Sequence, residues 1–270
     1  MDARTGVRHI RHLERDGEIA AVAIVTTAET AAEATSITTP EAAAAVPAEA
    51  ELVVKPSARH RGLGAQMLAA LLRDSSGSLL IWAHGDHPDA RALATRFSLT
   101  PERELFQLRL TPVRVHGAPA PVTAFRPGVD DTEWLALNAL AFAGHPEQGQ
   151  LTQTDLVSRL DEPWFNADDF LIARDDTGAM SGFCWLKVDG AVGEFYAVAV
   201  SPAAQGTGLG RALVNAGLAR LVARNIAVSS LYVEGENTAA LALYRSVGFI
   251  DFTVDVQYRG SAQPEIAGSF

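Results

Sequence analysis

A glycine-rich turn, Gln205-Gly206-Thr207-Gly208-Leu209-Gly210-Arg211, has the residue types and the spacing of a phosphate site. It follows an apolar run and precedes a segment whose apolar residues recur at helical spacing. Glycines let the backbone approach a ligand closely and adopt positive φ angles. The first N–H groups of a helix lack intrahelical partners and lie at the positive end of its dipole. The turn therefore predicts hydrogen bonds to a diphosphate.

Two other phosphate motifs do not fit this turn. A dinucleotide-binding Rossmann motif would lie near the first strand of its domain, with an acidic residue about 20 positions later. A P-loop would need Lys followed by Ser or Thr after the last glycine, where this sequence has Arg211. Glycines ahead of a helix can also serve only tight packing, which is the structural alternative.

Glu194 stands among apolar residues on the predicted strand 192–200, shortly before the turn. Burial disfavours the charged form of a carboxyl group and raises its pKa, which suits a general base. A salt-bridged or edge-exposed glutamate is the structural alternative. The position makes Glu194 a candidate for proton abstraction next to the diphosphate site.

The turn occurs twice in the chain. Residues 52–64 read LVVKPSARHRGLG and residues 198–210 read VAVSPAAQGTGLG. Both are an apolar strand, x-Pro, and then Arg or Gln-x-x-Gly-x-Gly, at a constant offset of 146 residues. A repeat of this length predicts a duplicated domain.

Apolar periodicity and turn residues predict the elements that carry these motifs. In the first half we expect a long loop at 26–50 and elements at 17–25, 51–54, 62–73, 78–83, 88–97 and 104–110. In the second half we expect elements at 122–126, 131–142, 152–160, 169–174, 180–188, 192–200, 207–224, 228–234, 237–246 and 250–258. Helices alternate with strands late in each half, which predicts an α/β (α+β) fold with a mixed twisted sheet flanked by helices in each domain.

The predicted domain organisation follows from the Pro- and Gly-rich stretch at 111–121, which excludes a regular helix or a central strand. We expect a first domain at 1–110, a linker at 111–121, a second domain at 122–260 and a tail at 261–270.

Composition excludes several function classes. The 270 residues carry a formal net charge of −10, which argues against a nucleic-acid-binding surface. No apolar run approaches the roughly 20 residues that span a bilayer, and the N-terminus lacks the apolar core of a signal peptide. The single Cys184 fits a small core residue in a reducing cytoplasm, and the seven His show no metal-ligand spacing.

The sequence resembles the GNAT acetyltransferases, whose acetyl-CoA motif is Arg/Gln-x-x-Gly-x-Gly/Ala after a strand. Both copies match it, and the second half also carries the later family pattern at 231–234, 237–240 and 243–249. Within this family the chain is similar to the mycothiol synthases. This likeness rests on the tandem layout and on the segments 82–85, 143–149, 164–165, 182–188 and 193–196. It covers roughly residues 8–260.

The resemblance implies a monomeric enzyme that uses acetyl-CoA and no metal, through a direct ternary complex. It would acetylate the cysteinyl amine of a Cys-glucosamine-inositol precursor and give mycothiol. The second domain would do the chemistry, while the first would hold acetyl-CoA. The family's first domain begins with a strand and two helices ahead of 17–25. The resemblance therefore implies either a shortened first domain or a recorded start that lies too late, and the Glu that the family brings to the substrate from there has no counterpart in this sequence.

The resemblance also implies roles for individual residues. Glu194 would be the general base and Tyr244 the general acid at the CoA sulfur, while a backbone N–H of Val200 or of a neighbour at a strand bulge would polarise the carbonyl. The substrate contacts would be Glu147, Lys187, Glu194 and Tyr232. Acetyl-CoA would contact Val198, Ala199, Val200, Gln205, Gly206, Thr207, Gly208, Leu209, Gly210, Arg211, Asn237, Thr238, Ala239, Ala240, Leu241 and Ala242 in the second domain, and Leu52, Val53, Val54, His60, Arg61, Gly62, Leu63, Gly64 and Ala65 in the first.

The repeat provides an internal comparison. The offset of 146 places Ala48 opposite Glu194, and aligning the residues before each closing strand places Ala94 opposite Tyr244. We therefore expect the first domain to keep the phosphate turn and to lack both catalytic groups. Two alternatives stay open at this point: a tandem GNAT enzyme for another small amine or a peptide N-terminus, and an acetyl-CoA-binding regulator without catalysis.

Overall fold

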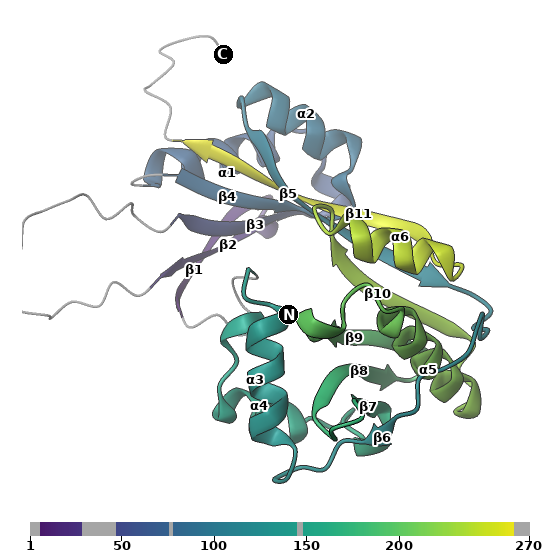
Figure 1. Ribbon diagram of the computed structural model, residues 1–270. Coiled ribbons are helices and arrows are strands. Elements are labelled where there is room, and N and C mark those ends of the chain that lie inside the picture. Colours follow the sequence, from purple (N-terminus) through teal and green to yellow (C-terminus); the bar gives the residue numbers. More distant parts are fainter. Residues whose placement is uncertain (1–5, 29–46, 76–77, 145–147, 262–270) are drawn as a thin grey trace, which may run out of the picture. The chain divides into compact units, whose positions relative to one another are not determined.

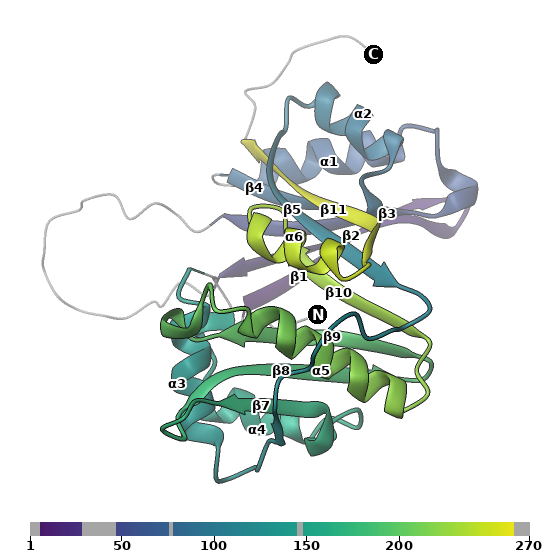
Figure 2. The same ribbon diagram turned by 45° about the vertical axis from the view of Figure 1, so that its right-hand side comes forward.

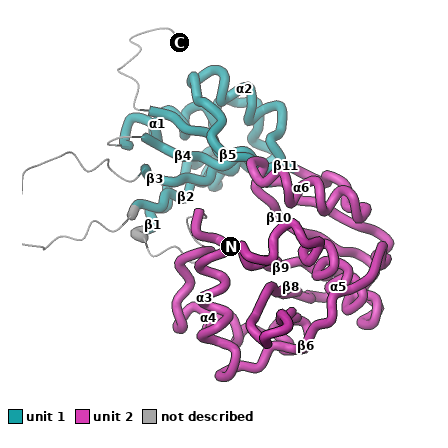
Figure 3. Tube along the Cα trace, in the orientation of Figure 1, with its two compact units in different colours: residues 1–105, 254–270 teal, residues 106–253 magenta. Residues whose placement is uncertain are grey.

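The computed structural model describes residues 6–28, 47–75, 78–144 and 148–261 (Figure 1). The chain forms two compact units (Figure 3). Unit 1 comprises Met1–Leu105 with Val254–Phe270, and unit 2 comprises Phe106–Thr253. Most predicted helices and strands are present within a few residues of their expected bounds, and the predicted α/β fold class with mixed sheets is confirmed.

Unit 1 is a sheet with two helices and a core of aliphatic side chains. Its strands lie in the order β1-β2-β3-β4-β11-β5. β3 and β4 pair in parallel, and the pairs β1–β2, β2–β3 and β4–β11 are antiparallel. The strand bounds are β1 (Gly6–Arg15), β2 (Glu18–Ala28), β3 (Ala48–Val54), β4 (Ser78–Ala83), β5 (Thr100–Leu110) and β11 (Ile250–Ser261). The helices are α1 (Leu63–Asp74) and α2 (Pro88–Arg96). Buried Met67, Leu68, Leu71 and Leu72 of α1 face the sheet.

β1 was not expected from the sequence. Its residues are mostly charged or polar, and only Leu13 packs against the core, so the strand lacks an apolar alternation. It pairs with β2 through a tight turn in which Asp16 and Gly17 both have positive φ angles, 56° and 79°. Asp-Gly at this place is the residue pair that a two-residue hairpin favours. Of the loop expected at 26–50, residues 29–46 lie outside the described residues.

Unit 2 is a sheet with helices on both faces (Figure 2) and a packed core on each face. Its strands lie in the order β5-β10-β9-β8-β7-β6, where β9 and β10 are parallel and β6 to β9 pair in antiparallel fashion. The remaining strands are β6 (Thr123–Ala124), β7 (Phe170–Arg174), β8 (Met180–Asp189), β9 (Val192–Val200) and β10 (Val228–Glu234). The helices are α3 (Asp131–Ala141), α4 (Gln153–Leu160), α5 (Leu209–Ala223) and α6 (Thr238–Ser246). Helices α5 and α6 cover one face, and α3 with an aromatic cluster around Trp134 and Trp185 covers the other.

The Pro- and Gly-rich segment 111–121 lies on unit 2. The Val113 N–H donates to the Ala227 carbonyl (3.0 Å) and the Ala120 N–H to the Ala212 carbonyl (2.9 Å). The His116 N–H donates to the side-chain oxygen of buried Asn215 (3.1 Å). The segment has no regular element, as expected, but its backbone hydrogen bonds hold it against α5 and the start of β10.

The division of the chain differs from the expected boundaries at its end. Residues 250–258 were expected to close the second domain, whereas β11 continues to Ser261 and its residues from Val256 onward pair with β4 in unit 1. Val256 and Tyr258 contribute buried side chains to the core of unit 1. The repeat predicts that a strand occurs here, but it does not tell which sheet the strand joins.

Gly217 of α5 allows the helix to approach β9 closely. A Cβ atom at this position would lie 2.5 Å from the Phe195 ring and 2.8 Å from the Cys184 sulfur. We expect Gly217→Ala to lower the free energy of unfolding by about 1–3 kcal/mol, because overpacking outweighs the gain in helix propensity. Urea unfolding followed by circular dichroism measures this. Gly210→Ala in the same helix is the control, since its Cβ would meet only ordinary contacts at 3.6 and 3.7 Å, and an equal loss there would contradict the packing argument.

Candidate functional site

The glycine-rich turn of unit 2 folds as a helix N-terminus with open space beside it. Gly208 is the N-cap of α5 and adopts a left-handed conformation with φ 91° and ψ −4°. Cβ atoms placed on Gly206 and Gly208 would meet nothing within 4 Å. The first N–H groups of α5 have no intrahelical acceptors. The protein's own packing therefore leaves the predicted diphosphate site accessible.

β9 and β10 are paired only as far as Phe195 and Leu231, and their unpaired ends form an opening between the two strands ahead of this turn. β9 carries a bulge at Tyr196, because Trp185 of β8 pairs with Ala197 and the next residue, Leu186, pairs with Phe195. The parallel pairing of β9 with β10 ends at Phe195 and Leu231, next to the bulge. Beyond this pair the two strands run to the N-termini of α5 and α6. The Asn237 side chain caps α6 by accepting from the Ala240 N–H at 3.1 Å.

Glu194 lies at the closed end of this opening. Its register partners are Lys187 on β8 and Ser230 on β10. Burial raises the pKa of the Glu194 carboxyl above its ordinary value, and the positive charge of Lys187 acts in the opposite direction. The Lys187 ammonium lies 5.2 Å from the centroid of the Trp164 ring, a cation–π distance. The carboxylate is therefore half-buried beside one cation that an aromatic ring also attracts.

Tyr232 shares the face of the sheet on which Glu194 and Lys187 lie. Its neighbours Leu231 and Val233 belong to the core under α5 and α6, so Tyr232 points to the other side. The ring is exposed, and its hydroxyl accepts a hydrogen bond from the Gln107 side chain at 2.8 Å. Three of the four expected substrate contacts thus share one face. The fourth, Glu147, lies outside the described residues.

Tyr244 lies on the opposite face of the sheet from Glu194. It is buried in the core under α5 and α6, with its ring 5.8 Å from that of Phe249. Burial raises the pKa of the Tyr244 phenol, so the group keeps its proton at neutral pH. Phe195 belongs to the same core, whereas the preceding Glu194 points away from it. The two expected catalytic side chains therefore belong to opposite faces of the sheet.

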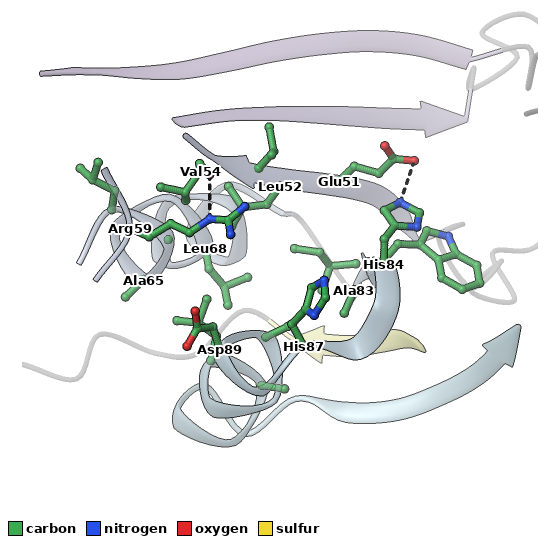
Figure 4. Close-up of a pocket in the computed structure, with 18 of the residues that line it drawn as sticks. Glu51, Leu52, Val54, Arg59, Ala65, Leu68, Ala83, His84, His87 and Asp89 are labelled. Atoms are coloured by element: carbon green, nitrogen blue, oxygen red, sulfur yellow. Dashed lines mark hydrogen bonds and ion pairs between the residues drawn. The ribbon is translucent and has the colours of Figure 1, made fainter. Parts of the chain in front are cut away.

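Unit 1 repeats the turn and holds a cavity of about 840 Å³ beside it (Figure 4). Gly62 is the N-cap of α1 with φ 81° and ψ −3°, close to the values at Gly208. His60 takes the position of Gly206 and also has a positive φ, 57°. The Arg59 side chain donates to the Val54 carbonyl at 3.2 Å. Of the nine residues expected to contact acetyl-CoA here, all but Arg61 line the cavity: Leu52, Val53, Val54, His60, Gly62, Leu63, Gly64 and Ala65.

The strand registers correct the comparison between the two units. Glu49 pairs with Thr26 of β2 and Leu80 of β4, while Glu194 pairs with the matching positions of β8 and β10. Glu49, and not Ala48, is therefore the counterpart of Glu194. The expectation that unit 1 lacks this carboxylate was wrong, because the bulge residue Tyr196 adds one position to β9 and reduces the offset ahead of it by one.

The comparison of Ala94 with Tyr244 is confirmed. Helices α2 and α6 begin and end 150 residues apart, and both end in the same hydrogen bond. The Leu99 N–H donates to the Ala94 carbonyl at 2.8 Å, and the Phe249 N–H donates to the Tyr244 carbonyl at 3.1 Å. Unit 1 therefore has a methyl group where unit 2 has a phenol.

Polar residues that sequence reasoning missed lie in the wall of the cavity and in contact with it: Glu51 and His84 line the cavity, and Asp255 binds His84. His84 Nδ1 lies 3.0 Å from Asp255 Oδ2, and His84 Nε2 lies 3.8 Å from Glu51 Oε1. The Glu49 carboxylate accepts from the indole of Trp82 (2.6 Å), which lines the cavity, and from the Gln257 amide (2.7 Å). Asp255 and Gln257 belong to β11, far from His84 and Glu49 in the sequence, so no local pattern could have predicted these contacts.

Three further observations concern Cys184, metal sites and membrane-spanning helices. Cys184 is fully buried, and burial raises the pKa of its thiol, which makes it a core residue. The described residues contain no cluster of three or more His, Cys, Asp or Glu side chains that could hold a metal ion. Among the same residues, no helix has both the length and the apolar character needed to cross a membrane.

Comparisons with known proteins agree with this geometry. Residues 134–249 match the model of the acetyltransferase (GNAT) family. The chain is 52% identical over 231 residues to a mycothiol acetyltransferase of Sanguibacter keddieii, covering 78% of this chain and 73% of the relative. It is 48% identical over 225 residues to a mycothiol acetyltransferase of Thermobispora bispora, covering 79% and 76% of the two chains.

Solved structures show the same fold. A GCN5-related N-acetyltransferase from Sphaerobacter thermophilus superimposes with a TM-score of 0.68 at 22% identity, over 93% of this chain and 79% of the other. A tandem GNAT protein from the clavulanic acid biosynthesis pathway superimposes with a TM-score of 0.63 at 16% identity, over 96% and 84%. From its sequence likeness and its fold, the chain belongs to the mycothiol acetyltransferase family of GNAT enzymes.

Proposed function

We propose that this chain transfers the acetyl group of acetyl-CoA to the cysteinyl amine of 1D-myo-inositol 2-(L-cysteinylamino)-2-deoxy-α-D-glucopyranoside, giving mycothiol and CoA. The observation that carries this proposal is that β9 stops pairing with β10 directly after Glu194 and Phe195 and continues to the accessible N-terminus of α5. The likeness to mycothiol acetyltransferases supports the choice of amine. The single, buried Cys184 suits a cytoplasmic enzyme, and we expect it to act as a monomer.

Acetyl-CoA would lie along the open edge of β9 with its diphosphate on the turn. The backbone of Val198, Ala199 and Val200 would bind the pantetheine arm, and the N–H groups from Gln205 to Arg211 would bind the diphosphate. The first turn of α6, Asn237–Ala242, would border the arm on the β10 side. A backbone N–H of Val200 or of a residue at the Tyr196 bulge would polarise the thioester carbonyl.

The amine substrate would approach from the face that carries Lys187, Glu194 and Tyr232. Carboxylates at Glu194 and Glu147 suit an ammonium group, and the Tyr232 hydroxyl and the Lys187 ammonium suit the many hydroxyl groups of the sugar and the inositol. The Gln107 contact would fix the orientation of the Tyr232 hydroxyl.

The chemistry removes two protons from the substrate nitrogen and gives one proton to the CoA sulfur. Glu194, with its raised pKa, would remove a proton from the substrate ammonium, directly or through water. The free amine would attack the thioester carbonyl, the C–N bond would form, and the C–S bond would break. The leaving thiolate would take the phenolic proton of Tyr244, which burial keeps on the oxygen until then. The second proton of the attacking nitrogen would leave to water as the amide forms, and the Tyr244 phenolate would regain a proton from water, while Glu194 would release its own proton to solvent. The products are the amide and CoA.

Unit 1 would bind acetyl-CoA without turning it over. Its turn and cavity suit a CoA ligand. However, Ala94 offers no proton for a thiolate, and Glu49 is held by hydrogen bonds from Trp82 and Gln257. β3 also lacks the bulge that opens β9. These differences support a binding role.

The purified chain should release CoA from acetyl-CoA when it is given the cysteinyl-glucosaminyl-inositol amine. A thiol-reactive dye measures the release, with the N-acetylated product as the control that should give none. Turnover of other small amines or of a peptide N-terminus at a higher kcat/KM would instead favour a different substrate. Acetyl-CoA binding without any turnover by the folded protein would favour the regulator.

Replacing Glu194 should remove a base and leave the cofactor in place. Glu194→Gln should lower kcat by about 10²–10⁴-fold with little change in acetyl-CoA affinity. Because the base must be deprotonated, wild-type activity should fall as pH decreases through the raised pKa, and Glu194→Gln should lose this dependence. Lys187→Met removes a charge that lowers this pKa, so the acidic limb should move to higher pH. Asp189→Asn, at an exposed position, is the control and should leave the acidic limb of the pH profile in place. An acidic limb that stays in place in both Glu194→Gln and Lys187→Met, as in this control, would argue against the assignment of Glu194 as the base.

A carboxylate in the first helical turn should separate the two CoA sites. Arg211 of α5 and Ala65 of α1 occupy equivalent positions 146 residues apart. An acidic residue there suits the helix dipole and repels a diphosphate. Arg211→Glu should raise the KM for acetyl-CoA by at least about tenfold, or 1.4 kcal/mol. Ala65→Glu should leave that KM unchanged and remove one of two sites in calorimetry, and an equal rise in KM would contradict a binding-only unit 1.

A further inference from the structure

The cavity of unit 1 extends to where unit 2 has the Tyr244 ring. Part of its wall is a helix-side recess formed by Leu68, Ile81, Leu93, Ala94, Leu99 and Tyr258. Because α2 and α6 match residue for residue, Ala94 stands at the position of Tyr244, and Leu99 stands at that of Phe249. Two aromatic rings that fill the core of unit 2 are thus replaced by smaller side chains. Both Ala94 and Leu99 line the cavity, so in unit 1 the cavity reaches the two positions that carry aromatic rings in unit 2.

The wall of the helix-side recess is apolar. Five of its six residues are aliphatic, and the sixth, Tyr258, donates its hydroxyl to Asp86 Oδ1 at 2.8 Å, so its polar atom is already satisfied. Figure 4 shows the Leu68 side chain reaching into the cavity between the α1 side and His87 at the start of α2. A recess of this kind favours a hydrocarbon group, because burying a methylene group contributes roughly 0.8 kcal/mol.

The path between β3 and β4, which the end of a bound pantetheine arm could otherwise take, is restricted. In unit 2 the parallel strands separate after Phe195 and Leu231, whereas in unit 1 the pairing continues one pair further, to Glu51 and Trp82. β2 and β3 pair without a register shift, so no bulge widens this point. Glu51 and His84 also meet there across the two strands, with 3.8 Å between Oε1 and Nε2 (Figure 4). The arm that passes between the strands in unit 2 meets paired strands in unit 1.

We propose that the cavity of unit 1 binds a CoA thioester whose acyl chain is longer than acetyl, with that chain in the helix-side recess. The proposal rests on the CoA site proposed for unit 1, with the diphosphate at Gly62–Ala65. Its volume of about 840 Å³ lies within the range of roughly 300–1,000 Å³ that small-molecule sites occupy. The ligand stays intact, since the position of the general acid carries only the methyl group of Ala94.

The experiment is calorimetry on the full-length Arg211→Glu chain, in which the CoA site of unit 2 is weakened. Acetyl-CoA, butyryl-CoA and hexanoyl-CoA are titrated separately. We expect one strong site whose affinity rises by about fourfold for each added methylene group. Equal affinities for the three thioesters, or no binding of any of them, would overturn the proposal.

The Ala94→Tyr substitution in the same background tests the recess itself, because it restores the side chain of unit 2. The gain with chain length should disappear, while Ala94→Ser, which leaves the volume nearly unchanged, should keep it. If Ala94→Tyr melts early by circular dichroism, the smaller Ala94→Val should still remove part of the gain. A gain that survives both Ala94→Tyr and Ala94→Val would place the acyl chain elsewhere and reject the proposal.

Acetyl transfer separates this proposal from the proposed function. Ala94→Tyr in the otherwise unaltered chain should acetylate the cysteinyl amine at the wild-type rate, because Ala94 belongs to unit 1. Normal transfer together with no chain-length preference in the Arg211→Glu chain would reject only the longer-chain ligand. Absence of transfer by the wild-type chain would reject the enzyme assignment and leave the titrations as a separate measurement.

Discussion

One extra residue in β9 governs the difference between the two units. At Tyr196 the strand bulges, so Tyr196 and Ala197 face the same side of the sheet, and the pairing with β10 ends at the neighbouring Phe195. Bulges redirect side chains and end strand pairing. In β3 the pairing is regular on both sides and continues one pair further. The same turn and helix therefore adjoin an opening in unit 2 and a cavity in unit 1.

The two matching glutamates show how surroundings decide a role. Glu49 and Glu194 occupy the same position in their sheets. Glu49 accepts two neutral hydrogen bonds, from Trp82 and Gln257, which satisfy a half-buried carboxylate. Glu194 is half-buried beside Lys187, whose ammonium also lies over the Trp164 ring. A carboxylate that the protein satisfies is structural, whereas the environment of Glu194 keeps its pKa raised and suits proton transfer.

Much of the fold and of the phosphate turn could be predicted, because their signals are local. Proline after the strand, glycine at the N-cap and helical apolar spacing lie within a few residues of one another, and the repeat confirmed them a second time. The position of Glu49 could not be predicted, since a bulge changes the register without changing the residue types. β1 has too few apolar residues to signal a strand. The contacts of Asp255 and Gln257 depend on a strand partner that only the folded chain reveals.

The path of β11 has a consequence for the order in which the protein forms during synthesis. Its residues from Val254 onward belong to unit 1, and they follow the whole of unit 2 in the chain. Val256 and Tyr258 pair with β4, and their side chains are buried in the core of unit 1. The first half of the polypeptide therefore leaves the ribosome without one strand of its own sheet. Unit 1 reaches its final packing only after the residues of unit 2 have been translated, which reverses the usual order in which domains mature from the N-terminus.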